Sequence, residues 1–169
     1  MTTMFRYETV FDAPSRDYVL AAYFDDDHLA VQDQAAALED RKVVESHEDE
    51  TVRKATWSVR SQRPLPLFVR PFVEGGRLSY LEKMTWRKAD GEIDLEIVPQ
   101  ILGGRVQIKA VYQLTDLEPG KVKRRYQGSI TVNVKLLSKK IENAIAAEID
   151  KGMPMMTECT ANWLRSKAK

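Results

Sequence analysis

Hydrophobic and polar residues alternate with a period of two along most of this chain. The alternation is clearest in residues 78–87, 92–101, 105–114 and 121–136, which predicts four strands with one apolar face each. Turn sequences that contain glycine stand between these segments, so successive strands are expected to pair antiparallel. The pattern therefore predicts a meander that is apolar on one side only.

The period changes to that of a helix from Ser138 to the end of the chain. Apolar residues then recur at or near helical spacing, at Ile141, Ile145, Ile149, Met156 and Trp163. Gly152 and Pro154 interrupt this stretch, and a kink or short break is expected because proline lacks the N–H group of a helical residue. A long helix with one apolar stripe is suited to cover the apolar face of the sheet.

The N-terminal part of the chain adds a strand, two short helices and a hairpin. These elements are expected at residues 4–11 (strand), 15–24 and 28–38 (helices), and 41–47 and 51–61 (hairpin strands). Ser15 and the run from Asp25 to Asp27 are typical helix N-caps. The predicted order is strand, two helices, strands, and one long helix.

Residues 63–72 form a proline-rich segment between the hairpin and the meander. Its three prolines exclude a regular central strand or a continuous helix, while Leu65, Leu67, Phe68 and Phe72 make it apolar. Two interpretations remain open: the apolar side chains pack under the domain, or they gate a pocket or touch an anionic membrane surface.

The order of elements resembles the helix-grip fold of the START/polyketide cyclase-like (SRPBCC) superfamily, in one of its bacterial branches. The stretch Phe11-Asp12-Ala13-Pro14 followed by Tyr18-Val19 is similar to the start of many members, and the resemblance covers essentially the whole chain. It implies an α+β fold in which a curved antiparallel sheet wraps around a long C-terminal helix, with two short helices after the first strand. It also implies an apolar ligand held between sheet and helix. No catalytic residue is shared throughout the superfamily, so none is assigned from it.

Composition narrows the range of partners. The 169 residues fit one domain spanning 1–169, and 26 basic against 25 acidic side chains argue against nucleic acid. One cysteine and two histidines offer no disulfide or zinc spacing, and neither a cofactor nor a metal is predicted. The N-terminus lacks signal-peptide character and no apolar run is long enough to span a bilayer, so we expect a cytoplasmic protein with at most peripheral membrane contact. The sequence does not indicate the oligomeric state.

Two charged residues interrupt the apolar faces of the predicted strands. Glu82 lies between Tyr80 and Met84, and Arg124 interrupts the last strand. The alternation of the strands therefore directs both side chains toward the covered side of the sheet, where they could face each other. In one interpretation they reach solvent at the rim or form a structural ion pair. In the other, they orient the polar group of a ligand.

Aromatic and methionine side chains complete the candidate binding site. They combine apolar bodies with polar tips or flexible stems, and are Trp57, Tyr80, Met84, Trp86, Tyr112, Tyr126 and Met156. Ordinary core packing explains each of them equally well when it is taken alone.

These observations favour a protein that binds a hydrophobic or amphipathic lipid-like molecule without changing it chemically. Transport of this molecule is one possible purpose of the binding. Glu82, Arg124 or a tyrosine would hold the polar end of the molecule. One alternative is a cyclase-like or hydrolase-like enzyme that uses Glu82 and a tyrosine as acid and base. Another is a protein interaction module whose core is filled by side chains.

Overall fold

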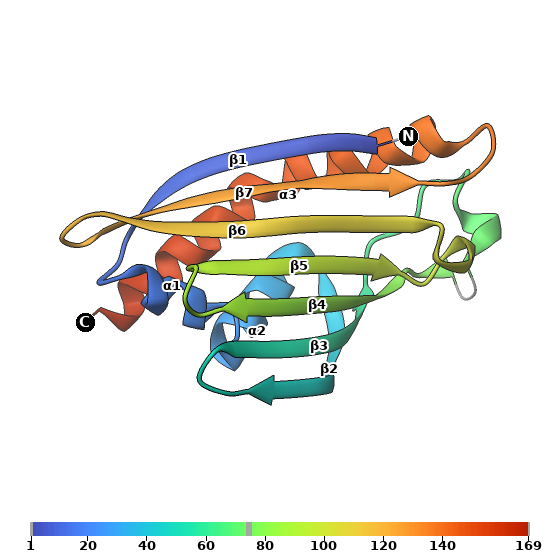
Figure 1. Cartoon of the computed structure of the whole chain (residues 1–169). Coiled ribbons are helices and arrows are strands. Elements are labelled where there is room, and N and C mark those ends of the chain that lie inside the picture. Colours follow the sequence, from blue (N-terminus) through green and yellow to red (C-terminus); the bar gives the residue numbers. More distant parts are fainter. Residues whose placement is uncertain (1, 74–75, 169) are drawn as a thin grey trace.

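Seven antiparallel strands form one sheet in the computed structural model, which describes residues 2–73 and 76–168 (Figure 1). The strands are β1 (Thr2–Asp12), β2 (Leu38–Glu48), β3 (Val52–Ser61), β4 (Ser79–Arg87), β5 (Glu92–Pro99), β6 (Val106–Glu118) and β7 (Lys121–Val132). Their order across the sheet is β1-β7-β6-β5-β4-β3-β2, so the first strand pairs with the last. Strands β2 to β7 follow one another as the predicted meander.

Three α-helices lie on one side of this sheet (Figure 1). They are α1 (Arg16–Ala22), α2 (Asp26–Ala36) and α3 (Ser138–Lys167). Ser15 caps α1 by accepting a hydrogen bond from the Tyr18 amide, and Asp25 caps α2 through the amides of Asp27 and His28, as the sequence predicts. The α+β helix-grip architecture expected from the sequence is confirmed.

Helix α3 shows no break near Pro154, although a break was one of the two outcomes expected there. It runs as one helix from Ser138 to Lys167 with Pro154 inside it, so the chain does not break there. Proline removes one backbone donor, but both halves of α3 bury apolar side chains, including Ile141 and Leu164, and this packing keeps the helix continuous.

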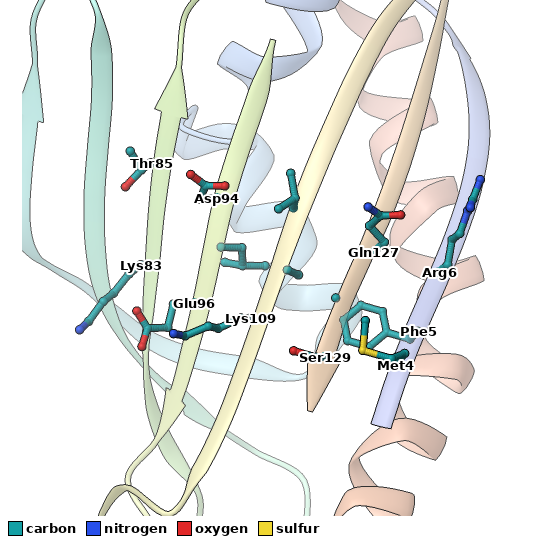
Figure 2. Close-up of a pocket in the computed structure, with 14 residues that line it drawn as sticks. Met4, Phe5, Arg6, Lys83, Thr85, Asp94, Glu96, Lys109, Gln127 and Ser129 are labelled. Carbon is teal, nitrogen blue, oxygen red and sulfur yellow. The ribbon is translucent and has the colours of Figure 1, made fainter. Parts of the chain in front are cut away.

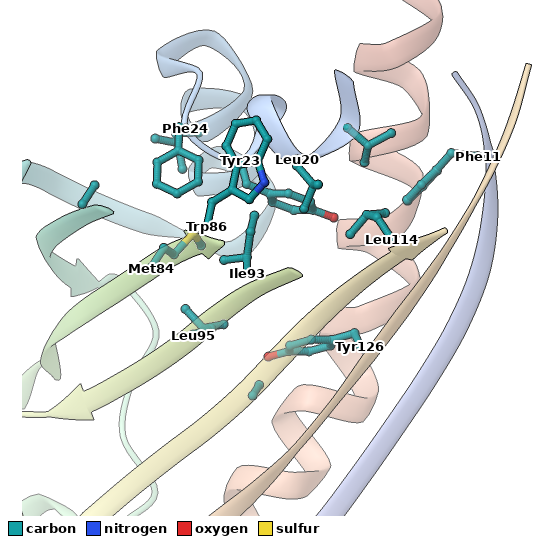
Figure 3. Close-up of a cluster of buried hydrophobic side chains, with 14 of the residues drawn as sticks. Phe11, Leu20, Tyr23, Phe24, Met84, Trp86, Ile93, Leu95, Leu114 and Tyr126 are labelled. Carbon is teal, nitrogen blue, oxygen red and sulfur yellow. The ribbon is translucent and has the colours of Figure 1, made fainter. Parts of the chain in front are cut away.

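The apolar core consists of two clusters at opposite ends of the inner face. The first lies beneath α1, α2 and the C-terminal half of α3 and includes Phe11, Tyr23, Ile93 and Leu164 (Figure 3). The second lies beneath the N-terminal half of α3 and includes the residues Val69, Val106, Ile130 and Ile141. Alternating positions of the strands supply both, which confirms the predicted inner face.

The proline-rich segment contributes mainly to the second cluster. Val69 is buried there, with Leu65 and Phe68 packed against it. Leu67 and Phe72 keep 76% and 44% of their surface exposed. Packing therefore explains part of this segment, and two of its large apolar side chains face solvent.

Gly128 on β7 lies tightly against β6. A Cβ atom at this position would lie only 2.3 Å from the backbone oxygen of Lys109, so no other residue fits without moving the backbone. Phe5, its partner across β1, packs against both apolar clusters. Small residues at this point, Gly128 and Ala110, leave the middle of the inner face with little side-chain bulk.

Helix α3 covers the sheet unevenly. Within the described part of the chain its backbone lies close to β1, β7 and α2, and stands further from β4, β5 and β6. The space above these three strands must be occupied by their inward side chains or by something else. The polar residues singled out from the sequence lie around this space.

Candidate functional site

Three tyrosines form a stack on the inner face of the sheet. The ring centroids of Tyr23 and Tyr112 are 4.5 Å apart and those of Tyr112 and Tyr126 are 4.6 Å apart, with nearly parallel planes. Tyr112 and Tyr126 are partners across β6 and β7, and Tyr23 reaches them from the end of α1. The stack gives this part of the inner face a flat aromatic surface.

Two inward tyrosines, Tyr80 and Tyr112, are only partly covered. Burial raises the pKa of both Tyr80 and Tyr112, yet both keep accessible surface and are only half-buried. Burial also raises the pKa of Tyr126. The hydroxyls of these three tyrosines are not among the enclosed polar atoms without a partner, so they are not sealed from solvent in the way that Arg124 Nε is. In Figure 3 the hydroxyl of Tyr126 lies on the side of its ring that faces Leu95.

Arg124 lies beside the tyrosine stack and is 3% exposed. Its Nη1 donates to the Tyr23 hydroxyl at 2.8 Å, and its Nη2 donates to Thr157 Oγ1 at 2.7 Å. The sulfur of Met153 is 3.8 Å from Nη2. The guanidinium also lies over the rings of Phe11 and Tyr112, at 5.0 and 5.7 Å from their centroids.

Glu82 pairs with Arg41. The Nη1 of Arg41 is 3.4 Å from Glu82 Oε1, while its Nε and Nη2 each donate to Asp33 at 2.7 Å. Burial raises the pKa of the Glu82 carboxyl, and the charge of Arg41 opposes this only in part. Glu82 and Arg124 both lie on the inner face as parity predicts, but they do not pair with each other, because each has partners from other elements.

The remaining candidates from the sequence divide into packed and partly open side chains. Trp57, Met84 and Trp86 are buried in the first cluster next to Phe24, and Arg41 lies 5.4 Å from the Trp57 ring centroid. The Nε1 of Trp86 is enclosed without an acceptor among the described residues. Met156 is half-buried on α3, whereas Met153, three residues earlier, packs against the first cluster.

A buried histidine connects α2 to α3 next to this site. His28 is 0% exposed, and its ring nitrogens lie 2.9 Å from the Ala22 carbonyl oxygen and 3.0 Å from Thr160 Oγ1. Burial lowers its pKa to about 4. His28 is therefore neutral at physiological pH and holds the two helices together.

Sequence reasoning did not identify Asp33, Arg41, Tyr23 and Thr157 as parts of this site. Asp33 and Arg41 belong to elements whose faces were ambiguous in the sequence, and their pairing depends on how α2 docks on the sheet. Tyr23 belonged to the predicted apolar stripe of the first helix, but its contact with Arg124 joins positions 101 residues apart. Such contacts leave no local signal.

A hollow lies on the outer face of the sheet. It has a volume of about 840 Å³ and is shown in Figure 2, where α3 lies behind the strands. Charged residues of both signs line it, including Arg6, Lys83, Asp94 and Lys109. Most of these side chains are exposed, so a ligand there would lose little contact with water.

The described residues, 2–73 and 76–168, contain neither a metal-binding cluster nor a membrane-spanning helix. Among them, no group of three or more His, Cys, Asp and Glu side chains is placed to hold a metal ion. None of their helices combines the length and the apolar character needed to cross a bilayer.

Comparison with solved structures identifies the fold. The Zhui aromatase/cyclase from Streptomyces sp. R1128 superposes with a TM-score of 0.70 and 11% identity, covering 100% of this chain and 97% of that one. Norcoclaurine synthase from Thalictrum flavum gives a TM-score of 0.62 and 13% identity over 100% and 98% of the two chains. A START superfamily protein from Mycobacterium smegmatis gives 0.59 and 7% over 96% and 97%.

Comparison of sequences places the chain in a family. A search of curated proteins finds no significant match. A family model described as "Protein of unknown function (DUF2505)" matches residues 6–164, nearly the whole chain. The chain therefore belongs to the DUF2505 family and has the helix-grip fold of the START/polyketide cyclase-like superfamily.

Proposed function

We propose that this protein binds a hydrophobic or amphipathic small molecule between the inner face of β4–β6 and helix α3. The proposal is supported mainly by the partial burial of Tyr80 and Tyr112. Both lie deep enough for burial to raise their pKa, yet both retain accessible surface at the place where α3 stands away from the sheet. Apolar walls with a few polar groups are typical of small-molecule sites.

The surrounding side chains match an amphipathic ligand. The apolar clusters at both ends of the inner face offer surface for its apolar body, at about 25 cal/mol for each Å² removed from water. The tyrosine hydroxyls, Glu82 and Arg124 offer polar partners for one end. Proteins with this fold hold ligands of varied chemistry, and a lipid-like molecule fits the mainly apolar lining.

A pair of bulky substitutions on β5 tests the location of the site. Ile97 is on the inner face opposite Glu82, and Val98 is the next residue on the outer face. Ile97→Trp should fill the space and weaken binding of the neutral fluorescent probe N-phenyl-1-naphthylamine at least about tenfold, equivalent to about 1.4 kcal/mol. Val98→Trp adds the same bulk outside and should leave the affinity unchanged. Equal effects of both substitutions, or no saturable binding to the unmodified protein, would contradict the proposal.

A second candidate function is acid–base catalysis on the bound molecule, and Glu82 is the observation that favours it. Its carboxyl accepts one long hydrogen bond from Arg41, at 3.4 Å, and burial raises its pKa. General acids often have a raised pKa. Two of the similar structures are named as a cyclase and a synthase. In this case Glu82→Gln would abolish conversion of the molecule recovered with the protein while its affinity persists. Recovery of the same molecule unchanged after incubation with the unmodified protein would leave binding as the function.

A further inference from the structure

Arg124 is a buried cation without an anionic partner. Only 3% of its surface is exposed, and its hydrogen bonds go to a hydroxyl from Tyr23, a hydroxyl from Thr157 and the weak sulfur acceptor of Met153. Its Nε is enclosed and has no acceptor among the described residues. No carboxylate in the described part of the chain forms an ion pair with it, whereas Arg41, which is mostly covered, has two.

A buried guanidinium normally needs a counter-charge. Removal of a charge from water is costly, and neutral hydroxyls and aromatic rings compensate for only part of the loss. A carboxylate supplies the missing charge and matches the forked geometry of the guanidinium with two parallel hydrogen bonds. The environment of Arg124 is therefore better suited to a negatively charged group than to the neutral groups that surround it.

Helix α3 is adaptable at the point where it covers Arg124. Met153 has a flexible side chain, and its sulfur is the weakest of the contacts made by the guanidinium, at 3.8 Å. Pro154 leaves the helix without one backbone donor, and no atom lies within 4 Å of the place that a Cβ of Gly152 would occupy. Rotation of Met153 would thus open Nη2 to the space next to Tyr112 without unfolding the helix.

The charges between the sheet and α3 also favour one orientation of a bound ligand. In the cluster of Asp33, Arg41 and Glu82 two carboxylates already face the one guanidinium, so the cluster offers no uncompensated positive charge to an acid. Arg124 lies beyond the tyrosine stack, and its positive charge attracts an acid. An acidic apolar molecule would therefore place its acid at Arg124 and its apolar body along Tyr112 toward β4 and β5.

We infer that the ligand is an apolar molecule carrying a carboxylate, and that Arg124 binds this carboxylate after Met153 moves aside. The inference rests on the proposed binding of a small molecule between the sheet and α3. It adds the chemical class of the ligand and the residue that recognises it. Tyr23 and Thr157 hold the guanidinium in place on both sides.

Fluorescence titrations with cis-parinaric acid and its methyl ester test the inference, because the two probes share one apolar body and differ in charge. The unmodified protein should bind the acid at least about tenfold more tightly than the ester, as one hydrogen-bonded charge pair implies. Arg124→Met should remove this preference while the ester still binds. Arg125→Met is the matched control, since Arg125 is the next residue on β7, faces outward and pairs with Glu8 at 2.9 Å. It should keep the full preference.

Arg124→Lys retains the charge and should keep part of the preference for the acid, which protects the test if Arg124→Met fails to fold. Equal affinity of the unmodified protein for acid and ester would overturn the inference while leaving small-molecule binding intact. A preference that persists in Arg124→Met would overturn it as well. If neither probe binds the unmodified protein, the proposed function fails together with the inference.

Discussion

Arg41, which is mostly covered, and Arg124, which is buried, have opposite surroundings. Arg41 makes two short hydrogen bonds to Asp33 and a longer one to Glu82, and so ties α2 to β2 and β4. Arg124 is even less exposed, but contacts only neutral groups. The charge of Arg41 is compensated within the protein, as expected of a structural residue. That of Arg124 is not, as expected of a residue that binds something else.

Replacement of each arginine by methionine is expected to show the largest difference between them. Arg41→Met leaves the buried Glu82 and the half-buried Asp33 without a cation and should lower the free energy of unfolding by about 3 kcal/mol. Arg124→Met leaves no charge behind and relieves the burial of one, so the change should stay within about 1 kcal/mol. Urea denaturation of both variants measures the difference. Similar losses in the two variants would show that Arg124 is as structural as Arg41.

The pH dependence of stability should respond to Arg124 through His28. The pKa of His28 falls from 6.5 to about 4 on folding, first because of burial, with the charge of Arg124 adding to the effect. The unfolded chain then binds more protons than the native state between these values, so stability is complete above pH 6.5 and decreases as the pH falls toward 4. The total loss is about 3 kcal/mol.

Thermal or urea unfolding between pH 7 and pH 4 checks this dependence. His28→Gln should reduce it, and His47→Gln, at an exposed histidine, should not. Arg124→Met should make the loss smaller because the repelling charge is gone. An unchanged slope in His28→Gln would mean that other groups cause the acid sensitivity.

The two carboxylates next to Arg41 should contribute unequally. Asp33→Asn removes both 2.7 Å hydrogen bonds to charged oxygen and should cost about 2 kcal/mol. Glu82→Gln removes a 3.4 Å contact and a carboxyl that burial disfavours in its charged form, so its cost should be below about 1 kcal/mol. Unfolding free energies near neutral pH provide the comparison. A larger loss in Glu82→Gln would assign the structural role to Glu82 instead.

The sequence predicted the fold well because its signals are local. Alternation identified the inward face of each strand, and glycine-containing turns indicated antiparallel neighbours. Ser15 and Asp25 were identified as caps because a cap acts within a few residues. Element ends were less well predicted: β2 begins at Leu38, because Ala37 ends α2 in a left-handed conformation that its residue type does not announce.

The sequence predicted which side chains of the strands point toward the site, but not their partners. Parity turned Glu82 and Arg124 inward, but the partner of each depends on the docking of α2 and α3, which no local pattern reports. An ion pair between Glu82 and Arg124 was one of the options left open by the sequence, and it does not form because each side chain has partners from other elements. The continuity of α3 through Pro154 also depends on tertiary packing, because the packing of both helix halves outweighs one missing backbone donor.

Native mass spectrometry of the purified protein, followed by extraction and identification of any bound molecule, tests the central claim most directly. We predict one apolar molecule with a carboxylate per chain, which is retained by Arg125→Met and lost or exchanged for neutral molecules in Arg124→Met. A mass equal to that of the chain alone, unchanged after exposure to a broad lipid extract, would contradict the binding site between the sheet and α3.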